Sequence, residues 1–131
     1  MRGVGKVIDL HSHILPGVDD GAQTMEKSIQ MAEAAVADGI GRIVATPHHR
    51  NGAYENYKNN IQIQVSELNR TFKEKGIHLE VLPGQETRIY GEMLEGIEKE
   101  EILMINEHTN YVFVEFPVNE VYFLHVEEAA N

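Results

Sequence analysis

The sequence contains no cysteine and no apolar run long enough to span a lipid bilayer. Without cysteine there are no disulfide bonds, no thiolate metal ligands and no cysteine nucleophile, so any hydrolytic chemistry depends on metals, carboxylates, histidines or hydroxyl groups. Residues 1–6 also lack the apolar region and the small-residue cleavage site of a signal peptide. We therefore expect a cytoplasmic protein without membrane insertion.

Basic residues are scarce, because 11 lysines and arginines face 21 aspartates and glutamates and give a formal net charge of −10. This balance argues against a nucleic-acid partner, since backbone phosphates are held by clustered basic side chains. Carboxylates that bind divalent cations count as bare negative charge in such a sum, so a metal-loaded protein would be less anionic. The length of 131 residues and the hydrophobic fraction of 42% suit one globular domain over residues 1–131.

The hydrophobic pattern alternates between extended and helical segments. Apolar runs predict strands at residues 7–13, 42–46, 77–82 and 111–116. Periodic apolar positions predict helices at residues 25–36, 56–75 and 92–99, the first of them burying Met25, Ile29, Ala32 and Val36. Thr24 is expected to cap the first helix and Gly39 to end it. Strands that alternate with helices in this way call for parallel β-α units with right-handed crossovers, which is an α/β fold.

The first strand carries two histidines on one face. Alternate residues of an extended chain point the same way, so Asp9, His11 and His13 are expected to project together. Two imidazoles that converge at the end of a strand form a compact pair of ligands for a divalent transition metal. Chance alternation would be the ordinary interpretation of a lone pair, but further candidates follow along the chain.

Each later strand also ends close to a residue that can bind metal. His48 follows the second strand, Glu86 follows the third, and Glu115 lies near the end of the fourth between large apolar neighbours. A carboxylate in such surroundings is costly unless it is paired or bound to a cation. Parallel strands gather their carboxyl ends at one edge, so we expect these side chains to meet there. Mixed imidazole and carboxylate ligands suit Mn²⁺, Zn²⁺ or Fe²⁺, and a carboxylate can bridge two ions about 3.5–4 Å apart.

Asp20 has two interpretations that the sequence leaves open. It either hydrogen-bonds a ligand histidine or approaches a metal, or it is the turn residue that commonly precedes a glycine, here Gly21.

Four segments, in this order and spacing, resemble one known family. They are IDLHSHILPGVDDG (residues 8–21), ATPHH (45–49), LPGQETRIYGE (82–92) and VEFP (114–117). The chain resembles the polymerase-and-histidinol-phosphatase (PHP) metal-dependent phosphoesterases, and within them the manganese-dependent bacterial protein-tyrosine phosphatases of capsule and exopolysaccharide loci. The His-x-His opening marks the superfamily, whereas the Leu-Pro-Gly, Asp-Asp-Gly and GQETRIY elements are more specific to the tyrosine phosphatases.

The resemblance implies a fold and a site. The fold would be a distorted, seven-stranded relative of the TIM barrel, of which this chain would hold the first four β/α units. Manganese, or another divalent transition metal such as zinc or iron, would occupy two to three positions at the carboxyl face of the strands. The implied metal ligands are His11, His13, His48, Glu86 and Glu115, with Glu86 as the bridging carboxylate. Asp20 would lie close to the metals, and Arg50 and Arg88 would bind substrate phosphate, because guanidinium groups match phosphate oxygens bidentately.

The activity implied by the resemblance is hydrolysis of a phosphate monoester by a metal-activated water. The expected substrate is phosphotyrosine on a protein, with a bacterial tyrosine autokinase of polysaccharide export as the partner. A histidinol-phosphatase-like enzyme for small phosphate esters, an inactive metal-binding or interaction fragment, and a plain structural domain are the alternatives.

The length of the chain sets it apart from the family. A barrel of this kind needs roughly 250 residues, and family members carry a further ligand histidine and an Asp-x-His pair beyond residue 131. We therefore expect about the first half of such an enzyme: a truncated product, a shortened gene product that has lost its function, or a half-barrel completed by another copy of the chain or by another polypeptide. A half-barrel leaves a sheet edge and an apolar interior open, which favours a homo-oligomer, and full activity is not expected from a monomer.

Overall fold

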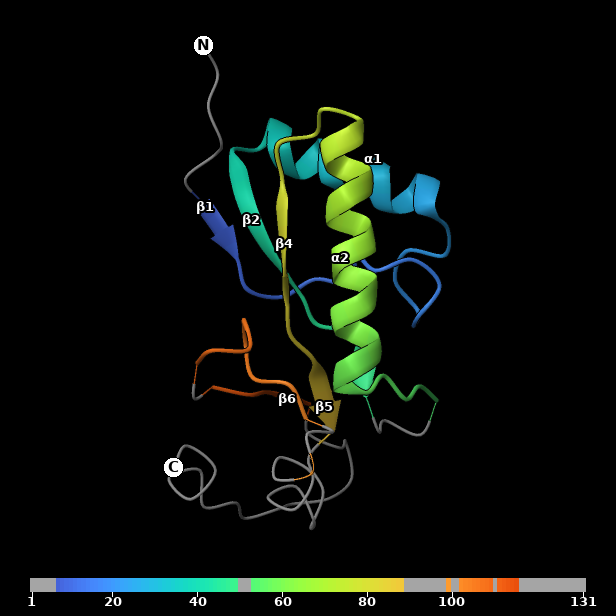
Figure 1. Ribbon diagram of the computed structural model, residues 1–131, viewed down its shortest axis with the longest axis vertical. Helices are drawn as coiled ribbons and strands as arrows, with labels where there is room; N and C mark the ends of the chain where they lie inside the picture. Colours follow the sequence, from blue (N-terminus) through green and yellow to red (C-terminus); the bar gives the residue numbers. More distant parts are fainter. Residues whose placement is uncertain (1–6, 50–52, 89–98, 100–101, 110, 116–131) are drawn as a thin grey trace.

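The computed structural model describes residues 7–49, 53–88, 99, 102–109 and 111–115, and these form an α/β structure (Figure 1). In chain order the elements are β1 (Val7–Asp9), α1 (Met25–Ala37), β2 (Ile40–Ala45), β3 (His48–His49), α2 (Lys58–Glu74), β4 (Glu80–Pro83), β5 (Glu86–Arg88) and β6 (Phe113–Glu115). No helix among these residues is both long enough and apolar enough to cross a membrane.

All the strand pairs are parallel, in the orders β1-β2-β4 and β3-β5-β6. Strand β2 pairs with β4 through Arg42 and Glu80, and β3 pairs with β5 through His48 and Glu86, so both pairs lie 38 positions apart in the sequence. The Glu86 N–H also donates to the Pro47 carbonyl at 2.9 Å, which links the two stretches. The second pairing therefore continues the register of the first across a short break.

Gly84 lies at this break, between β4 and β5. A Cβ atom there would lie 2.6 Å from Val44 Cγ1 and 3.1 Å from the Ala45 carbonyl oxygen, so only glycine lets the two strands approach this closely. Pro47 lies at the corresponding break between β2 and β3, where it cannot donate to a ladder. These two residues interrupt the strands just before β3 and β5, which begin with His48 and Glu86.

Both helices pack on the β1-β2-β4 sheet through apolar faces, α1 against β2 and α2 against β4. Thr24 caps α1 by accepting from the Lys27 N–H, and Gly39 follows the helix with a positive φ of 85°, as expected. The buried face of α1 is Ser28, Ala32 and Ala35, whereas the expected core residue Val36 is exposed. The predicted core positions of α2 are buried: Ile61, Val65, Leu68 and Phe72.

Most predicted extents differ from the structure by a few residues; the strands predicted at residues 42–46 and 77–82, for example, are Ile40–Ala45 and Glu80–Pro83. The first strand ends at Asp9 rather than residue 13, although the Thr46 N–H still donates to the Ser12 carbonyl at 2.8 Å and keeps the chain beside β2. Helix α2 begins at Lys58 rather than residue 56, because the Asn56 N–H is bonded to the His49 ring. The helix predicted at residues 92–99 lies outside the described residues, apart from a turn at residue 99.

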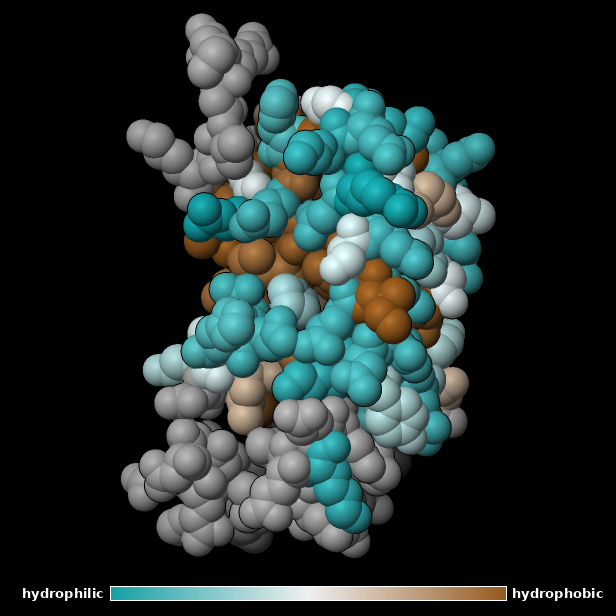
Figure 2. Space-filling view, in the orientation of Figure 1, coloured by the Kyte–Doolittle hydropathy of each residue, from teal (hydrophilic) through white to brown (hydrophobic). Residues whose placement is uncertain are grey.

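Strand β1 borders the β1-β2-β4 sheet, and exposed apolar side chains lie on it and directly after it. Val7, Ile8 and Leu10 are 55%, 48% and 55% exposed. Figure 2 shows apolar surface gathered beside this strand. We call these three residues the β1 edge patch.

Candidate metal centre

The predicted ligands come from four segments and meet beyond the carboxyl ends of β1, β2 and β4. His11 and His13 follow β1, His48 begins β3, Glu86 begins β5, and Glu115 ends β6. The parallel register sets Glu86 beside His48 and Arg88 beside Glu115. The expectation that strand ends would bring these side chains together is therefore met by the geometry.

A first group of ligand atoms consists of His11, His13 and Glu86. The two Nε2 atoms of the histidines lie 3.0 Å apart. The Oε2 atom of Glu86 lies 3.6 Å from His11 Nε2 and 3.3 Å from His13 Nε2. Three ligand atoms that surround one point at these distances suit a single cation.

A second group consists of His48, Glu86 and Glu115. The His48 Nδ1 atom lies 2.9 Å from Glu86 Oε2 and 3.3 Å from Glu115 Oε2. The same oxygen of Glu86 thus takes part in both groups. This is the position that a bridging carboxylate occupies between two ions.

Two atoms of the second group lack hydrogen bonds. His48 Nδ1 and Glu86 Oε2 are buried, and neither has a hydrogen-bond partner among the described residues, although they lie 2.9 Å apart. Leaving such atoms unsatisfied in a protein interior costs about 1–3 kcal/mol or more for charged groups. A divalent cation would satisfy both atoms, so this set of nitrogen and oxygen donors fits a transition-metal ion.

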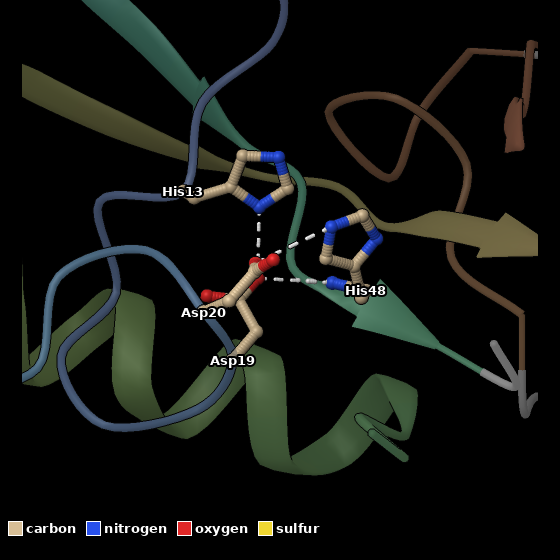
Figure 3. Close-up of side chains that lie close together, drawn as sticks. All are labelled: His13, Asp19, Asp20 and His48. Atoms are coloured by element: carbon tan, nitrogen blue, oxygen red, sulfur yellow. Dashed lines mark hydrogen bonds and ion pairs between the residues drawn. The ribbon is translucent and has the colours of Figure 1, made fainter. Parts of the chain in front are cut away.

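A third group consists of His13, Asp19, Asp20 and His48, whose ligand atoms lie together on the other side of the histidines (Figure 3). Asp20 is exposed, and its Oδ1 atom lies 3.4 Å from His48 Nε2. Of the two interpretations of Asp20, this contact favours the one in which it serves a ligand histidine. Asp19 is only 3% exposed, and its Oδ2 atom accepts from His13 Nδ1 at 2.8 Å.

The contact between His13 and Asp19 shifts both pKa values. The hydrogen bond to Asp19 raises the His13 pKa, and the nearby carboxylates of Asp19, Glu86 and Asp20 add to this against the opposing effect of burial. Burial is the largest single effect on Asp19 and raises its pKa. The hydrogen bonds from His13, Gly21 and His48 outweigh it, so the Asp19 pKa lies below its usual value.

The remaining sequence candidates are placed as follows. Arg88 donates from Nε and Nη2 to Oε1 of Glu115, at 3.0 and 2.6 Å. Asp9 belongs to none of the ligand groups among the described residues, and its Oδ1 atom accepts from the His11 backbone N–H at 3.1 Å. Arg50 lies outside the described residues.

A family model for capsular polysaccharide synthesis proteins of the CpsB/CapC type matches residues 7–130. The chain belongs to the CpsB/CapC family. It is 47% identical over 115 residues to the tyrosine-protein phosphatase YwqE of Bacillus subtilis (strain 168), covering 88% of this chain and 45% of YwqE. It is 38% identical over 115 residues to the putative tyrosine-protein phosphatase CapC of Staphylococcus aureus, with the same coverage of 88% and 45%.

A solved structure also matches this CpsB/CapC chain. It comes from crystal structures of YwqE from Bacillus subtilis and CpsB from Streptococcus pneumoniae, described as unique metal-dependent tyrosine phosphatases. The TM-score is 0.83 at 46% identity, over 88% of this chain and 47% of that one. The sequence resemblance is confirmed at the level of the family, as is the mixed α/β fold with parallel sheets. The chain spans about half the length of the relatives it matches.

Sequence reasoning missed one residue of this CpsB/CapC site, the buried Asp19. The Asp-Asp-Gly turn drew attention to Asp20 because that residue directly precedes the glycine. The available signal was the pair itself, since one of two adjacent carboxylates in a tight loop commonly turns inward to accept backbone N–H groups.

Proposed function

We propose that this chain carries part of a metal-dependent protein-tyrosine phosphatase and hydrolyses phosphotyrosine once metal is bound. Its fold would be the PHP-type barrel, represented here by the first four β/α units as a single domain over residues 1–131. The relatives named as tyrosine-protein phosphatases support this proposal, as does the arrangement of the ligand atoms. The cytoplasmic location expected from the sequence stays a prediction.

The single observation that carries the proposal is the buried Oε2 atom of Glu86. It belongs to the first and the second ligand group, and among the described residues it has no hydrogen bond that would explain its burial. His11 and His13 would hold one ion with Glu86, and His48 and Glu115 would hold a second. Asp20 contacts the far side of His48, where a third ion would lie within its reach.

When bound, such ions lower the pKa of a coordinated water and neutralise phosphate charge, which is the chemistry that a binuclear phosphatase needs. Manganese is the ion we propose, with zinc or iron as alternatives that the same nitrogen and oxygen donors accept. The protein contributes a partly buried rim that holds these donors in place.

Arg88 and Arg50 are the proposed binders of the substrate phosphate. Arg88 lies beside the second ligand group, because it is paired with Glu115 across neighbouring strands. A guanidinium at this edge places positive charge next to the ions and favours a phosphate dianion. Arg50 is proposed from the sequence resemblance alone.

An aromatic side chain borders the same site. The Phe113 ring centroid lies 4.3 Å from that of His11, so an apolar surface adjoins the first ligand group. Such a surface suits the aryl group of phosphotyrosine better than the polar side chain of a small phosphate ester. We therefore propose a phosphotyrosine protein as the substrate, with a tyrosine kinase of capsule synthesis as the partner.

The test compares a phosphotyrosine peptide, a phosphoserine peptide and histidinol phosphate as substrates for the manganese-loaded chain, with Glu86→Gln as the inactive control. We expect selective release of phosphate from the phosphotyrosine peptide. Preference for the small ester would replace the proposal with a histidinol-phosphatase-like function. Calorimetric binding of Mn²⁺ without turnover of any substrate would replace it with an inactive metal-binding fragment.

A further inference from the structure

The buried carboxylate of Asp19 takes no part in the function proposed above, yet it has the most hydrogen bonds of the acidic groups described near the ligands. Its Oδ2 atom accepts from the His13 ring at 2.8 Å and from the His48 backbone N–H at 3.1 Å. Its Oδ1 atom accepts from the Gly21 N–H at 2.9 Å. One side chain thus connects the segment after β1, its own loop and the start of β3.

The bond to His13 decides which nitrogen of that ring can bind metal. A neutral imidazole carries one N–H group, and a carboxylate beside Nδ1 holds the proton there. The lone pair is then on Nε2, the atom that faces His11 and Glu86. With the other tautomer, His13 would present an N–H group to the ions and could not bind them.

The hydrogen bond from the His48 backbone N–H to Asp19 fixes the position of the His48 segment relative to His13. His13 and His48 belong to different strand segments, and their rings stack with centroids 4.6 Å apart. Because one oxygen of Asp19 accepts from both residues, it ties the first ligand group to the second. The Ala22 N–H also donates to the His13 carbonyl at 3.1 Å, so the loop that carries Asp19 is folded back onto His13.

We propose that Asp19 is a positioning residue, which selects Nε2 of His13 as the metal ligand and holds the His13 and His48 segments together. The inference rests on the proposed metal site but not on the choice of substrate. Asp19 differs in this from its neighbour Asp20, which is exposed and lies at His48 Nε2. Asp19 also belongs to the third ligand group, but both of its oxygens already accept from N–H donors of the protein, which favours an orienting role over a place among the ligands.

The first test needs no substitution. Long-range ¹H–¹⁵N spectra of the metal-free full chain, at a pH that keeps the ring neutral, show which nitrogen of His13 carries the proton. We expect Nδ1–H in the wild type. An Nε2–H tautomer for His13 would overturn the proposal, whatever the variants do.

The second test is the Asp19→Asn variant. An asparagine there must turn its NH₂ group toward an N–H donor whichever way it is oriented, so it cannot satisfy all three. We expect a mixed tautomer at His13 and a loss of Mn²⁺ affinity of roughly 10–100-fold, the range measured for outer partners of metal ligands. The matched control is Asp9→Asn, which alters a carboxylate that accepts from the His11 backbone N–H instead of from a histidine ring; Mn²⁺ affinity should stay unchanged in this variant.

The outcomes separate this proposal from the proposed function. Loss of affinity in Asp19→Asn together with a wild type that binds Mn²⁺ but hydrolyses nothing supports the positioning role and rejects the phosphatase. Unchanged affinity and tautomer in a folded Asp19→Asn variant reject the positioning role and leave the phosphatase intact. Loss of one bound ion per chain, with the remaining affinity unchanged, would show that Asp19 is itself a ligand and would also reject the proposal.

Discussion

At Glu86, one carboxylate oxygen faces ligand histidines from two different segments. We expect Glu86→Gln to weaken Mn²⁺ binding by more than the roughly 10–100-fold typical of losing an outer partner of a ligand, since both ion positions lose a charged donor. In the metal-free chain, at a pH at which the neighbouring histidines are neutral, the same change should raise the free energy of unfolding by about 1 kcal/mol, because it removes a buried charge without a hydrogen bond. Calorimetric titration and denaturant unfolding with a chelator measure the two effects.

The control for Glu86 is Glu80→Gln, on the preceding strand β4, where the carboxylate is exposed and pairs with Arg42. This change should leave Mn²⁺ affinity as it is and alter stability by less than about 1 kcal/mol. A Glu86→Gln chain that loses stability without metal and still binds Mn²⁺ normally would show that Glu86 has a structural role only.

Arg88 donates twice to one oxygen of Glu115 and thereby leaves the other oxygen facing His48. We expect Arg88→Met to lower Mn²⁺ affinity about tenfold, because Glu115 loses the partner that orients it. At saturating Mn²⁺ the KM for a phosphotyrosine peptide should also rise, since the proposed phosphate contact is gone. An unchanged KM under these conditions would remove the phosphate-binding role and leave only the orienting one.

The structure offers a matched control for Arg88. Arg42 and Glu80 form another arginine–glutamate pair across neighbouring parallel strands, at 3.3 Å, but at the opposite ends of the strands from the site. Arg42→Met should change stability by less than about 1 kcal/mol and leave metal affinity and KM as they are.

The His13–Asp19 pair gives the metal-free chain a defined pH dependence. The His13 pKa is raised in the folded state, so its contribution is complete below the ordinary value of 6.5 and is lost as pH rises through the raised pKa. The Asp19 pKa is lowered, so its contribution is complete above the ordinary value of 3.8 and is lost as pH falls through the lowered pKa. The pair therefore stabilises the fold most between these two ordinary values.

Chemical unfolding of the wild type and Asp19→Asn in the presence of a chelator checks this window. The difference in free energy of unfolding should be largest between pH 3.8 and 6.5 and should shrink on either side. A difference that grows steadily with pH above this range would contradict the assignment.

At the scale of elements, the break between β4 and β5 depends on the absence of a side chain at Gly84. Gly84→Ala should destabilise the chain by about 1–3 kcal/mol, because the new methyl group meets Val44 Cγ1 at 2.6 Å and a backbone oxygen at 3.1 Å. Val44→Ala removes the side-chain part of this clash. The double variant should therefore lose less than the sum of the two single losses, and strict additivity in denaturant unfolding would disprove the contact.

The elements themselves were largely predictable from local pattern. The spacing of Ile61, Val65, Leu68 and Phe72 predicted α2 within a few residues, and the equivalence of His48 and Glu86 at their strand ends was confirmed by the register. What local pattern could not supply was the continuation of pairing beyond Pro47 and Gly84. Both residues are typical strand terminators, and only the neighbouring strand shows that the register resumes after them.

The meeting of the candidate side chains was predictable to the same degree and for the same reason, whereas their role as metal ligands stays a prediction. Ligands that lie at strand ends follow from topology, and those side chains do meet. The partners that orient them depend on contacts between a loop and a distant strand: Asp19 with the His48 backbone, and Arg88 with Glu115. Hydrophobic periodicity carries no information about such contacts, so these partners required coordinates.

At the scale of the whole molecule, the β1 edge patch is exposed. The ligand atoms, in contrast, are brought together by contacts within the described residues. An exposed strand edge with apolar side chains favours pairing with another chain. The homo-oligomer expected from the sequence stays a prediction, and we expect it to form through the β1 edge patch, whose residues belong to none of the ligand groups.

Sedimentation analysis of the wild type and of Ile8→Lys tests this assembly. We expect the wild type to form dimers or larger species as its concentration rises, and Ile8→Lys to remain monomeric, since a lysine on the strand blunts edge pairing. Ile63→Lys is the matched control, because Ile63 is 58% exposed on α2, away from this edge, and Ile8 is 48% exposed. If Ile63→Lys abolishes association as effectively as Ile8→Lys, the contact is a general apolar one and β1 is not the interface. If both variants and the wild type are monomers that bind Mn²⁺ equally, the patch has no role in self-association.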